Sequence, residues 1–358
     1  MSTSRAIPSL DGLRAISVGL VIFSHLFSST PSVFRDFRGH EIARLGQQGV
    51  DVFFVISGFL ITYLLLRELD SAGSISLRRF YLRRFFRIFP AFYAFLAVLG
   101  ILWLAKLIPL SGYSYICAAT YTYNYCRHAS DWLVGHCWSL SLEEQFYLLW
   151  PPLLLILGRK KSTYAAAGII VFSPASRLIS YLLLPAFRGS EGVMLHTRLD
   201  TIMFGCLIAL LYDNRAFNRL VDRWVSPIVA TGAAIVFVFV SPFLQARFEA
   251  KYLWTVGYTL NALCVSIVLL YAVRNSASLL GRLLNFRVMR HIGVISYALY
   301  LWQQLFTGPH AFWFPVNLLM ILLCAELSFA LIERPAFLLR DLMERRLRPK
   351  RISLEVAG

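Results

Sequence analysis

Long apolar runs without any charge recur along the chain, separated by short polar segments that are rich in Arg and Lys. The runs 88–105, 224–246 and 252–273 are the clearest, because a basic residue stands directly on both sides of each. A membrane-crossing helix needs about 20 predominantly apolar residues. Further predominantly apolar runs, most of which contain one or two charged residues, cover 10–29, 49–66, 138–157, 164–184, 197–212, 291–308 and 312–332. The pattern predicts an all-α, polytopic integral membrane protein with about ten transmembrane helices.

The segment 110–136 differs from these runs because it is rich in tyrosine and polar residues. We interpret it as an outer loop, and leave open whether part of it re-enters the membrane. With the N-terminus in the cytoplasm, 24 of the 35 Lys and Arg residues then lie in inside segments and eight in outside segments. A crossing at 110–136 would turn every later basic cluster outward, against the positive-inside rule. We therefore predict that both termini are cytoplasmic.

Composition supports the membrane interpretation and excludes other classes. The chain is 58% hydrophobic and 15% charged, whereas soluble domains are typically about 45–50% apolar and about 25% charged. A soluble domain, a disordered chain and a small disulfide scaffold are all excluded on this ground. The net charge of +16 is explained by the basic clusters between the runs rather than by nucleic-acid binding. We predict one transmembrane domain over residues 1–335 and a short basic cytoplasmic tail over 336–358.

Ionisable residues inside the apolar runs are candidates for function, because a charge at the bilayer centre costs about 2.5–3.5 kcal/mol on insertion scales. Arg14 and His25 lie eleven residues apart in the first run. On a helix they point within about 20° of one another and lie about 16 Å apart along the axis. Asp11 is one turn from Arg14 and can pair with it. The alternative is an interfacial Asp–Arg pair together with a buried, hydrogen-bonded histidine.

A pair of carboxylates, Glu143 and Glu144, falls in the outer half of the run 138–157. This is the depth predicted for His25. A carboxylate beside a histidine fixes its tautomer and raises its basicity. We therefore predict that Glu143 orients or charge-stabilises His25, with helix packing through hydrogen bonds as the alternative.

Two further sets of residues suggest how a ligand is held. Arg84 and Arg87 stand at the cytoplasmic entrance of the run 88–105, and arginine binds phosphate through two parallel hydrogen bonds. Anchoring to anionic lipid is the alternative for this basic run. Ser57 and Gly58 are small enough for a thin ligand, or simply another helix, to approach closely.

Arg198 and Asp200 stand at the outer end of the run 197–212, and with His196 they form an H-x-x-x-D pattern seen in some soluble acyltransferases. Five residues carry little information, so we favour a structural Arg–Asp pair or a contact with substrate over a catalytic dyad.

The predicted outer segment contains three cysteines, Cys117, Cys126 and Cys137. An oxidising compartment permits one disulfide there, and we take Cys126–Cys137 as the candidate. A zinc site formed by Cys126, His128, His136 and Cys137 is an alternative, although its spacing matches no standard zinc motif. We predict no metal ion for the functional site.

The ordered motifs of the chain resemble those of the membrane-bound acyltransferase-3 family, which includes O-antigen, Nod-factor and exopolysaccharide acetylases. The matching segments are 10–14 with His25, 49–61, 83–90, 138–147, 198–200 with Gly205, 295–302 and 333–335. The resemblance implies a membrane enzyme that uses cytoplasmic acyl-CoA, usually acetyl-CoA, as a co-substrate. It matches Arg14 and His25 to the family's Arg–His pair, and Arg84 and Arg87 to its paired arginines. Family members often carry a histidine where this chain has Gln303.

Together these observations predict an acetyl-CoA-dependent O-acyltransferase in a bacterial plasma (inner) membrane. Its acceptor is expected to be a cell-envelope or exported glycan, such as a polysaccharide or lipopolysaccharide. His25 would act as general base with Glu143, or would carry the acyl group itself. The acyl-CoA would be held by Arg14, Arg84, Arg87, Ser57 and Gly58, and the acceptor by Asp11, Glu144, Arg198, Asp200 and Gln303. The alternatives are a small hydroxylated acceptor such as a macrolide, or a non-enzymatic transporter of lipid-linked glycan.

Overall fold

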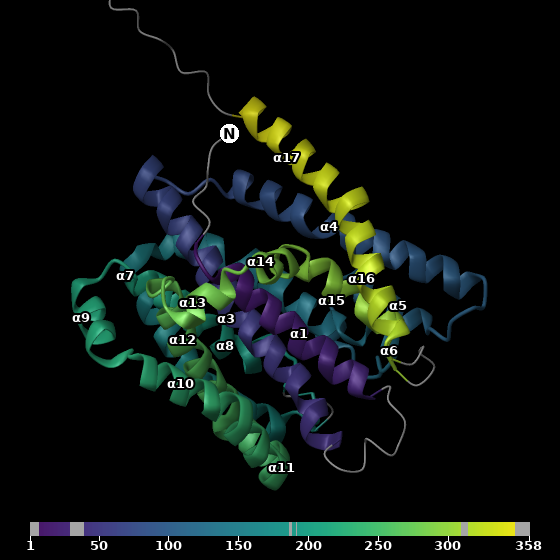
Figure 1. The fold of residues 1–358 in the computed structure, drawn as a ribbon, viewed down its shortest axis with the longest axis horizontal. Coiled ribbons are helices and arrows are strands. Elements are labelled where there is room, and N and C mark those ends of the chain that lie inside the picture. The colour runs from purple at the N-terminus through teal and green to yellow at the C-terminus, as the bar shows by residue number, and fades with distance from the viewer. Residues whose placement is uncertain (1–6, 29–38, 186–187, 191, 309–313, 348–358) are drawn as a thin grey trace, which may run out of the picture.

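The computed structural model describes residues 7–28, 39–185, 188–190, 192–308 and 314–347 of the chain. Within these ranges every regular element is helical, which confirms the all-α prediction. Figure 1 shows a bundle in which α1 and α3 occupy the centre, with α4 and α17 on one side and α10 and α11 on the other. The long helices are α1 (Leu10–Ser28), α3 (Gly39–Ala72), α4 (Leu77–Leu104), α7 (Cys137–Leu183), α8 (Leu195–Leu211), α12 (Tyr258–Arg274), α16 (Val316–Ser328) and α17 (Arg334–Leu347).

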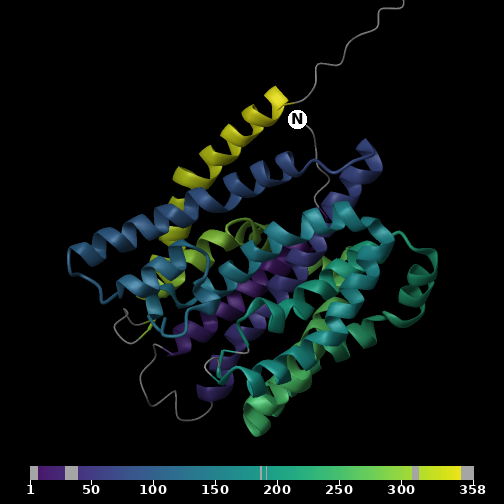
Figure 2. The same ribbon diagram turned by 180° about the vertical axis from the view of Figure 1, so that it is seen from behind.

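Shorter elements connect or extend these helices. They are α5 (Gly112–Ala119), η1 (Tyr123–Tyr125), α6 (Trp132–Gly135), α9 (Arg215–Trp224), α10 (Pro227–Ile235), η3 (Val236–Val240), α11 (Ser241–Tyr252), η4 (Leu253–Gly257), α13 (Leu279–Leu284), α14 (Arg287–Val294), α15 (Ser296–Trp302), η5 (Gln303–Leu305) and η6 (Phe329–Glu333). From the opposite side, Figure 2 shows α17 lying beside the N-terminal half of α4.

By length and composition, six helical segments of the described residues are able to cross a membrane, or seven if α8 and α9, which are bent by 114°, count as one. This number is smaller than the predicted ten. Two of the segments, Trp132–Leu183 and Pro227–Arg274, contain 52 and 48 residues, more than twice the length that one crossing requires. Each is interrupted by a residue with a left-handed backbone, Gly158 (φ 69°) and Glu249 (φ 49°).

Helix α3 is the most enclosed segment, since Phe54, Val55 and Ile56 have no exposed surface. It packs against α8 through two glycines. A Cβ atom at Gly58 would collide with the carbonyl oxygen of Ile202, and one at Gly205 would collide with that of Val55. Small residues permit such close backbone approach between membrane helices. Gly58 therefore serves helix packing, which was the alternative for this residue, and a contact between Gly58 and a ligand stays a prediction.

Two buried ion pairs connect α3, α7 and α8. Arg198 on α8 contacts Asp51 on α3 at 2.5 Å, and Arg177 on α7 contacts Asp200 on α8 at 3.0 Å. All four side chains are completely buried. Both carboxylates also accept hydrogen bonds from α12, at 3.0 Å from Asn261 and 2.7 Å from Thr259.

These pairings correct the predicted role of Arg198 and Asp200. Neither side chain lines a pocket open to an acceptor, because each is enclosed and bonded to an opposite charge on another helix. His196 does not form a dyad with Asp200, since its Nε2 atom lies 3.0 Å from the hydroxyl of Ser180. The structural alternative holds, but with Asp51 and Arg177 as the partners.

The segment between α4 and α7 contains a disulfide bond between Cys117 on α5 and Cys126 after η1. The predicted Cys126–Cys137 pairing is wrong, because Cys137 begins α7 and its side chain faces the core, where it is buried as a free thiol. The disulfide also removes Cys126 from the alternative zinc site. In the part of the chain that the structure describes, no group of three or more potential ligands gathers at one place.

Candidate active site

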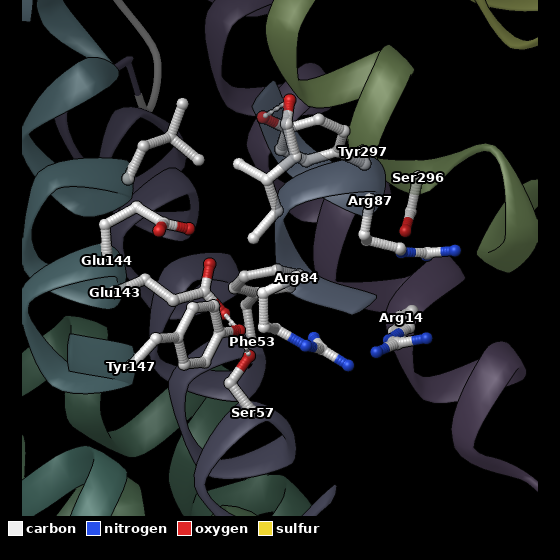
Figure 3. A pocket seen from close by; sticks show the side chains of 12 residues that line it. Arg14, Phe53, Ser57, Arg84, Arg87, Glu143, Glu144, Tyr147, Ser296 and Tyr297 are labelled. Atoms are coloured by element: carbon white, nitrogen blue, oxygen red, sulfur yellow. Dashed lines mark hydrogen bonds between the residues drawn. The ribbon is translucent and has the colours of Figure 1, made fainter. Parts of the chain in front are cut away.

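Six of the predicted site residues line one pocket, which we call the arginine pocket. They are Arg14, Ser57, Arg84, Arg87, Glu143 and Glu144. They come from α1, α3, α4 and α7, and Ser296 and Tyr297 from α15 complete the wall. Figure 3 shows the three arginines reaching toward the same side of this pocket, opposite the two glutamates. The fold therefore gathers six predicted residues that lie up to 130 positions apart in the sequence, from Arg14 to Glu144.

The arginines of this pocket have few carboxylate partners. Arg14 has one carboxylate partner, Asp11, at 3.8 Å. No carboxylate of the described residues lies within ion-pair distance of Arg84 or Arg87. Their guanidinium groups instead face aromatic rings, with Arg84 5.5 Å from the ring centre of Tyr147 and Arg87 5.4 Å from that of Phe337. Three neighbouring cations with one peripheral partner are suited to binding an anion.

The acidic side of the pocket is organised by Glu143. Its Oε1 atom accepts hydrogen bonds from the hydroxyls of Ser57 on α3 and Tyr147 one turn farther along α7. These three side chains are buried. Glu143 is thus fixed at the arginine pocket, and the prediction that it orients His25 is wrong. Tyr147 was not predicted as a site residue, although its spacing of four from Glu143 on a helix is a usable signal.

His25 lies in a second cluster, which we call the histidine end. Its Nδ1 atom is 2.6 Å from Oε1 of Gln303. The next residue, Gln304, binds a second imidazole in the same way, with its Oε1 atom 2.5 Å from Nδ1 of His136. Trp132 packs edge-on against His25 with ring centres 5.0 Å apart and donates a hydrogen bond to the carbonyl of Gln304.

A small apolar pocket, which we call the apolar passage, lies beside the arginine pocket. Its lining residues are Ser17, Val18, Val21, Val50, Phe53, Ser139, Leu140, Ser296, Tyr297 and Tyr300. Four of them, Phe53, Leu140, Ser296 and Tyr297, also line the arginine pocket. The passage and the arginine pocket therefore adjoin.

Helical register places the histidine end at the other end of this passage. One turn beyond its outermost lining residues come His25 on α1, Gly46 on α3, His136 before α7 and Gln303 after α15. Helices α1 and α3 run antiparallel here, because Ser17 bonds to the carbonyl of Gly49 while Gly46 faces His25. Arg14 and His25 thus mark the two ends, about 16 Å apart along α1.

The residues that were predicted to contact the acceptor lie at different places in the structure. Glu144 lines the arginine pocket, and Asp11 borders a separate hollow with Asn285 and Arg290. Gln303 is buried at the histidine end, where it holds His25. Sequence reasoning missed His136 and Gln304 as members of the histidine end. The position of His136, two residues before the motif at 138–147, was the available signal.

This fold and site define a multi-pass, all-helical membrane protein in which the arginine pocket adjoins an apolar passage, with the histidine end one helical turn beyond it. A family model described as an acyltransferase domain matches residues 7–332. The chain belongs to this family, acyltransferase-3, which confirms the resemblance seen in the motifs.

Two relatives indicate the chemistry associated with this domain. Peptidoglycan O-acetyltransferase OatA of Listeria monocytogenes is 27% identical over 370 residues, which cover 92% of this chain and 55% of the relative. O-acetyltransferase OatA of Staphylococcus aureus strain NCTC 8325 is 28% identical, over 94% of this chain and 58% of the relative. The chain thus spans little more than half the length of these curated relatives. No solved structure shows significant similarity to it.

Proposed function

We propose that this protein is a membrane-bound O-acyltransferase that transfers an acyl group, with acetyl as the first candidate, from cytoplasmic acyl-CoA to a hydroxyl of a cell-envelope or exported glycan. The observation that carries this proposal is the apolar passage between three arginines and His25. Because a relative is named a peptidoglycan O-acetyltransferase, a peptidoglycan sugar is the first acceptor to test.

The geometry suits an acyl-CoA donor. Coenzyme A carries three phosphate groups, which would bind the guanidinium groups of the arginine pocket. The pantetheine arm is thin and would lie in the apolar passage, so that the thioester reaches the histidine end. Ser57 lines the arginine pocket, where Glu143 accepts hydrogen bonds from Ser57 and Tyr147.

At the histidine end, His25 would act as general base. If its Nδ1–H donates to Gln303, the Nε2 atom carries the lone pair that accepts the acceptor's hydroxyl proton. The hydroxyl oxygen attacks the thioester carbonyl, the carbon–sulfur bond breaks, and the leaving thiolate takes the proton back from the imidazolium. Gln303, rather than Glu143, is the positioning residue for His25 in this scheme.

We propose the predicted topology of ten crossings with both termini in the cytoplasm, in a bacterial plasma membrane. The backbone breaks at Gly158 and Glu249 support it, because they divide each of the two overlong segments into two parts of membrane-spanning length. Cysteine labelling from the outside, at positions introduced near each break, tests this topology.

The function itself is tested by release of free thiol from acetyl-CoA. Purified protein in detergent should release CoA faster when a soluble peptidoglycan fragment is added, and mass spectrometry should find the fragment heavier by one acetyl group. Movement of a lipid-linked glycan across vesicles without any acetyl-CoA consumption would contradict the proposal and favour a transporter.

Arg87→Ala, alone and with Arg84→Ala, is expected to weaken donor binding. A hydrogen bond to a charged group contributes about 1.5–3 kcal/mol, so each change should raise the KM for acetyl-CoA by about 10-fold or more. The KM for acetylated pantetheine, which has no phosphate, should change little. Arg83→Ala is the matched control, because Arg83 is on the same helix but pairs with Glu68 and Glu344. Equal effects on both donors would contradict phosphate binding.

Gln303→Met is expected to lower kcat by about 10-fold or more, because removing the partner of a catalytic histidine allows the wrong tautomer. The KM for acetyl-CoA should stay unchanged, since Gln303 lies away from the arginine pocket. Gln303→Glu keeps an acceptor oxygen and should retain more activity than Gln303→Met. The opposite order of the two variants would show that the amide donates to His25 instead.

A further inference from the structure

His136 is a buried histidine whose tautomer is determined by its surroundings. The side chain is 3% exposed. The Oε1 atom of Gln304 accepts the backbone N–H of His136 at 2.9 Å, which identifies that atom as the amide oxygen. The same oxygen lies 2.5 Å from the Nδ1 atom of His136, so Nδ1 must carry the proton. The Nε2 atom therefore presents a lone pair.

That lone pair has no hydrogen-bond partner among the described residues. A buried polar atom left unpaired costs about 1–3 kcal/mol, and such atoms in native proteins call for an explanation. The side-chain nitrogen of Gln303, at the same end of the passage, is also buried, and it too has no hydrogen-bond partner in the described ranges. An unpaired acceptor and an unpaired donor thus lie on neighbouring groups of the histidine end.

His136 is close to the proposed reaction centre. Its partner Gln304 directly follows Gln303, the partner of His25, and its ring packs edge-on against Tyr300, with ring centres 5.4 Å apart. Tyr300 lines the apolar passage. The hydrogen bond to Gln304 accounts for the Nδ1 side of the imidazole, but no side chain or backbone group in the described part of the chain bonds to the Nε2 atom.

We propose that His136 binds the acceptor: its Nε2 atom accepts a hydrogen bond from a second hydroxyl or amide N–H of the sugar, next to the hydroxyl that reacts at His25. The unpaired amide nitrogen of Gln303 donates to an oxygen of the same sugar. This inference rests on the proposed function and assigns the acceptor site to the histidine end. It implies that a bare alcohol, with one hydroxyl and no further donor, is a poor acceptor.

Two substitutions of His136 test the Nδ1 and Nε2 sides of the imidazole separately. The amide nitrogen of Asn occupies the position of Nδ1, so His136→Asn keeps the donor to Gln304 but removes Nε2. The amide of Gln reaches the position of Nε2, so His136→Gln supplies an acceptor oxygen there and loses the bond to Gln304. If His136 has a purely structural role, His136→Gln should weaken disaccharide binding more than His136→Asn does. If His136 binds the acceptor, His136→Asn should weaken this binding more.

The first readout is binding of the disaccharide of N-acetylglucosamine and N-acetylmuramic acid to the full-length protein in detergent, measured by calorimetry. His136→Asn should weaken this binding by about 5-fold or more, as expected for loss of a buried hydrogen bond, with the thermal midpoint unchanged. His136→Gln should bind more tightly than His136→Asn. The KM for acetyl-CoA should be the same in all three proteins.

Equal affinity of wild type and His136→Asn for the disaccharide would overturn the inference, as would no binding by wild type. A lower thermal midpoint together with a raised KM for acetyl-CoA would show a structural role and would also overturn it. The proposed function is judged separately, by acetyl-CoA consumption in the wild type. Binding without consumption would refute the enzyme, while the effect of His136→Asn on binding would still decide the role of this residue.

Discussion

His25→Ala is expected to reduce acyl transfer by about 10²- to 10⁴-fold, the usual contribution of a positioned general base. The reason is that the imidazole is held by Gln303 at the far end of the passage from the arginines, where the thioester of a bound acyl-CoA would lie. The KM for acetyl-CoA should change little. The measurement is proton NMR of solubilised peptidoglycan and of surface polysaccharide, each before and after mild base, because base-labile acetyl signals report O-acetylation.

The control is His291→Ala. His291 is an exposed histidine that pairs with Glu326 at 2.5 Å, and it belongs to neither the arginine pocket nor the histidine end. Both variants should insert into the membrane at wild-type levels. Equal acetyl signals in wild type and His25→Ala would remove His25 from the catalytic path. An intact His25→Ala protein that still binds acetyl-CoA would support a role in the chemical step.

Asp51→Leu is expected to destabilise the fold by about 3–5 kcal/mol, because it leaves the guanidinium of Arg198 buried without a counter-charge. Both partners have no exposed surface, and two of the guanidinium nitrogens of Arg198 already lack a hydrogen-bond partner. The measurement is the thermal midpoint of the detergent-purified protein, followed by size-exclusion chromatography. The yield of inserted protein should fall in parallel.

The double variant Asp51→Leu/Arg198→Met should recover most of this loss, because replacing a whole buried ion pair by apolar residues is often neutral. Asp70→Ala is the control on the same helix. Asp70 is exposed and its partner Arg159 is half-buried, and a surface pair contributes about 1 kcal/mol or less. Destabilisation of the double variant by as much as Asp51→Leu would mean that the charges have a role beyond neutralising one another.

Much of the architecture could be predicted from local pattern. Apolar runs flanked by basic residues predicted a helical membrane protein, because the bilayer requires long apolar helices. Helical periodicity placed Arg14 and His25 on one face of α1, and the structure uses that face along the whole passage. The number of crossings differs, because the helices before and after Gly158, and before and after Glu249, follow one another with only a kink between them, whereas the charge pattern separates them.

The pairing of side chains between different helices could not be predicted in the same way. Glu143 and His25 were expected at one depth, but depth along the bilayer does not fix which helices face one another. Helix α7 turns Glu143 toward Ser57 at the arginine pocket, and α15 brings Gln303 to His25 instead. Similarly, Arg198 and Asp200 lie two residues apart on α8, so their side chains point in different directions. Arg198 therefore pairs with a carboxylate on α3, and Asp200 with an arginine on α7.

The sequence by itself determined the class of protein, the family and most members of the arginine pocket, because hydropathy, charge asymmetry and motif spacing are properties of single segments. Only the tertiary structure decided the disulfide, the buried ion pairs, the packing role of Gly58 and the two Gln–His pairs. These features depend on how helices rotate and cross, and that is set by side-chain packing among residues distant in sequence. The separation of the arginine pocket from the histidine end belongs to this second group.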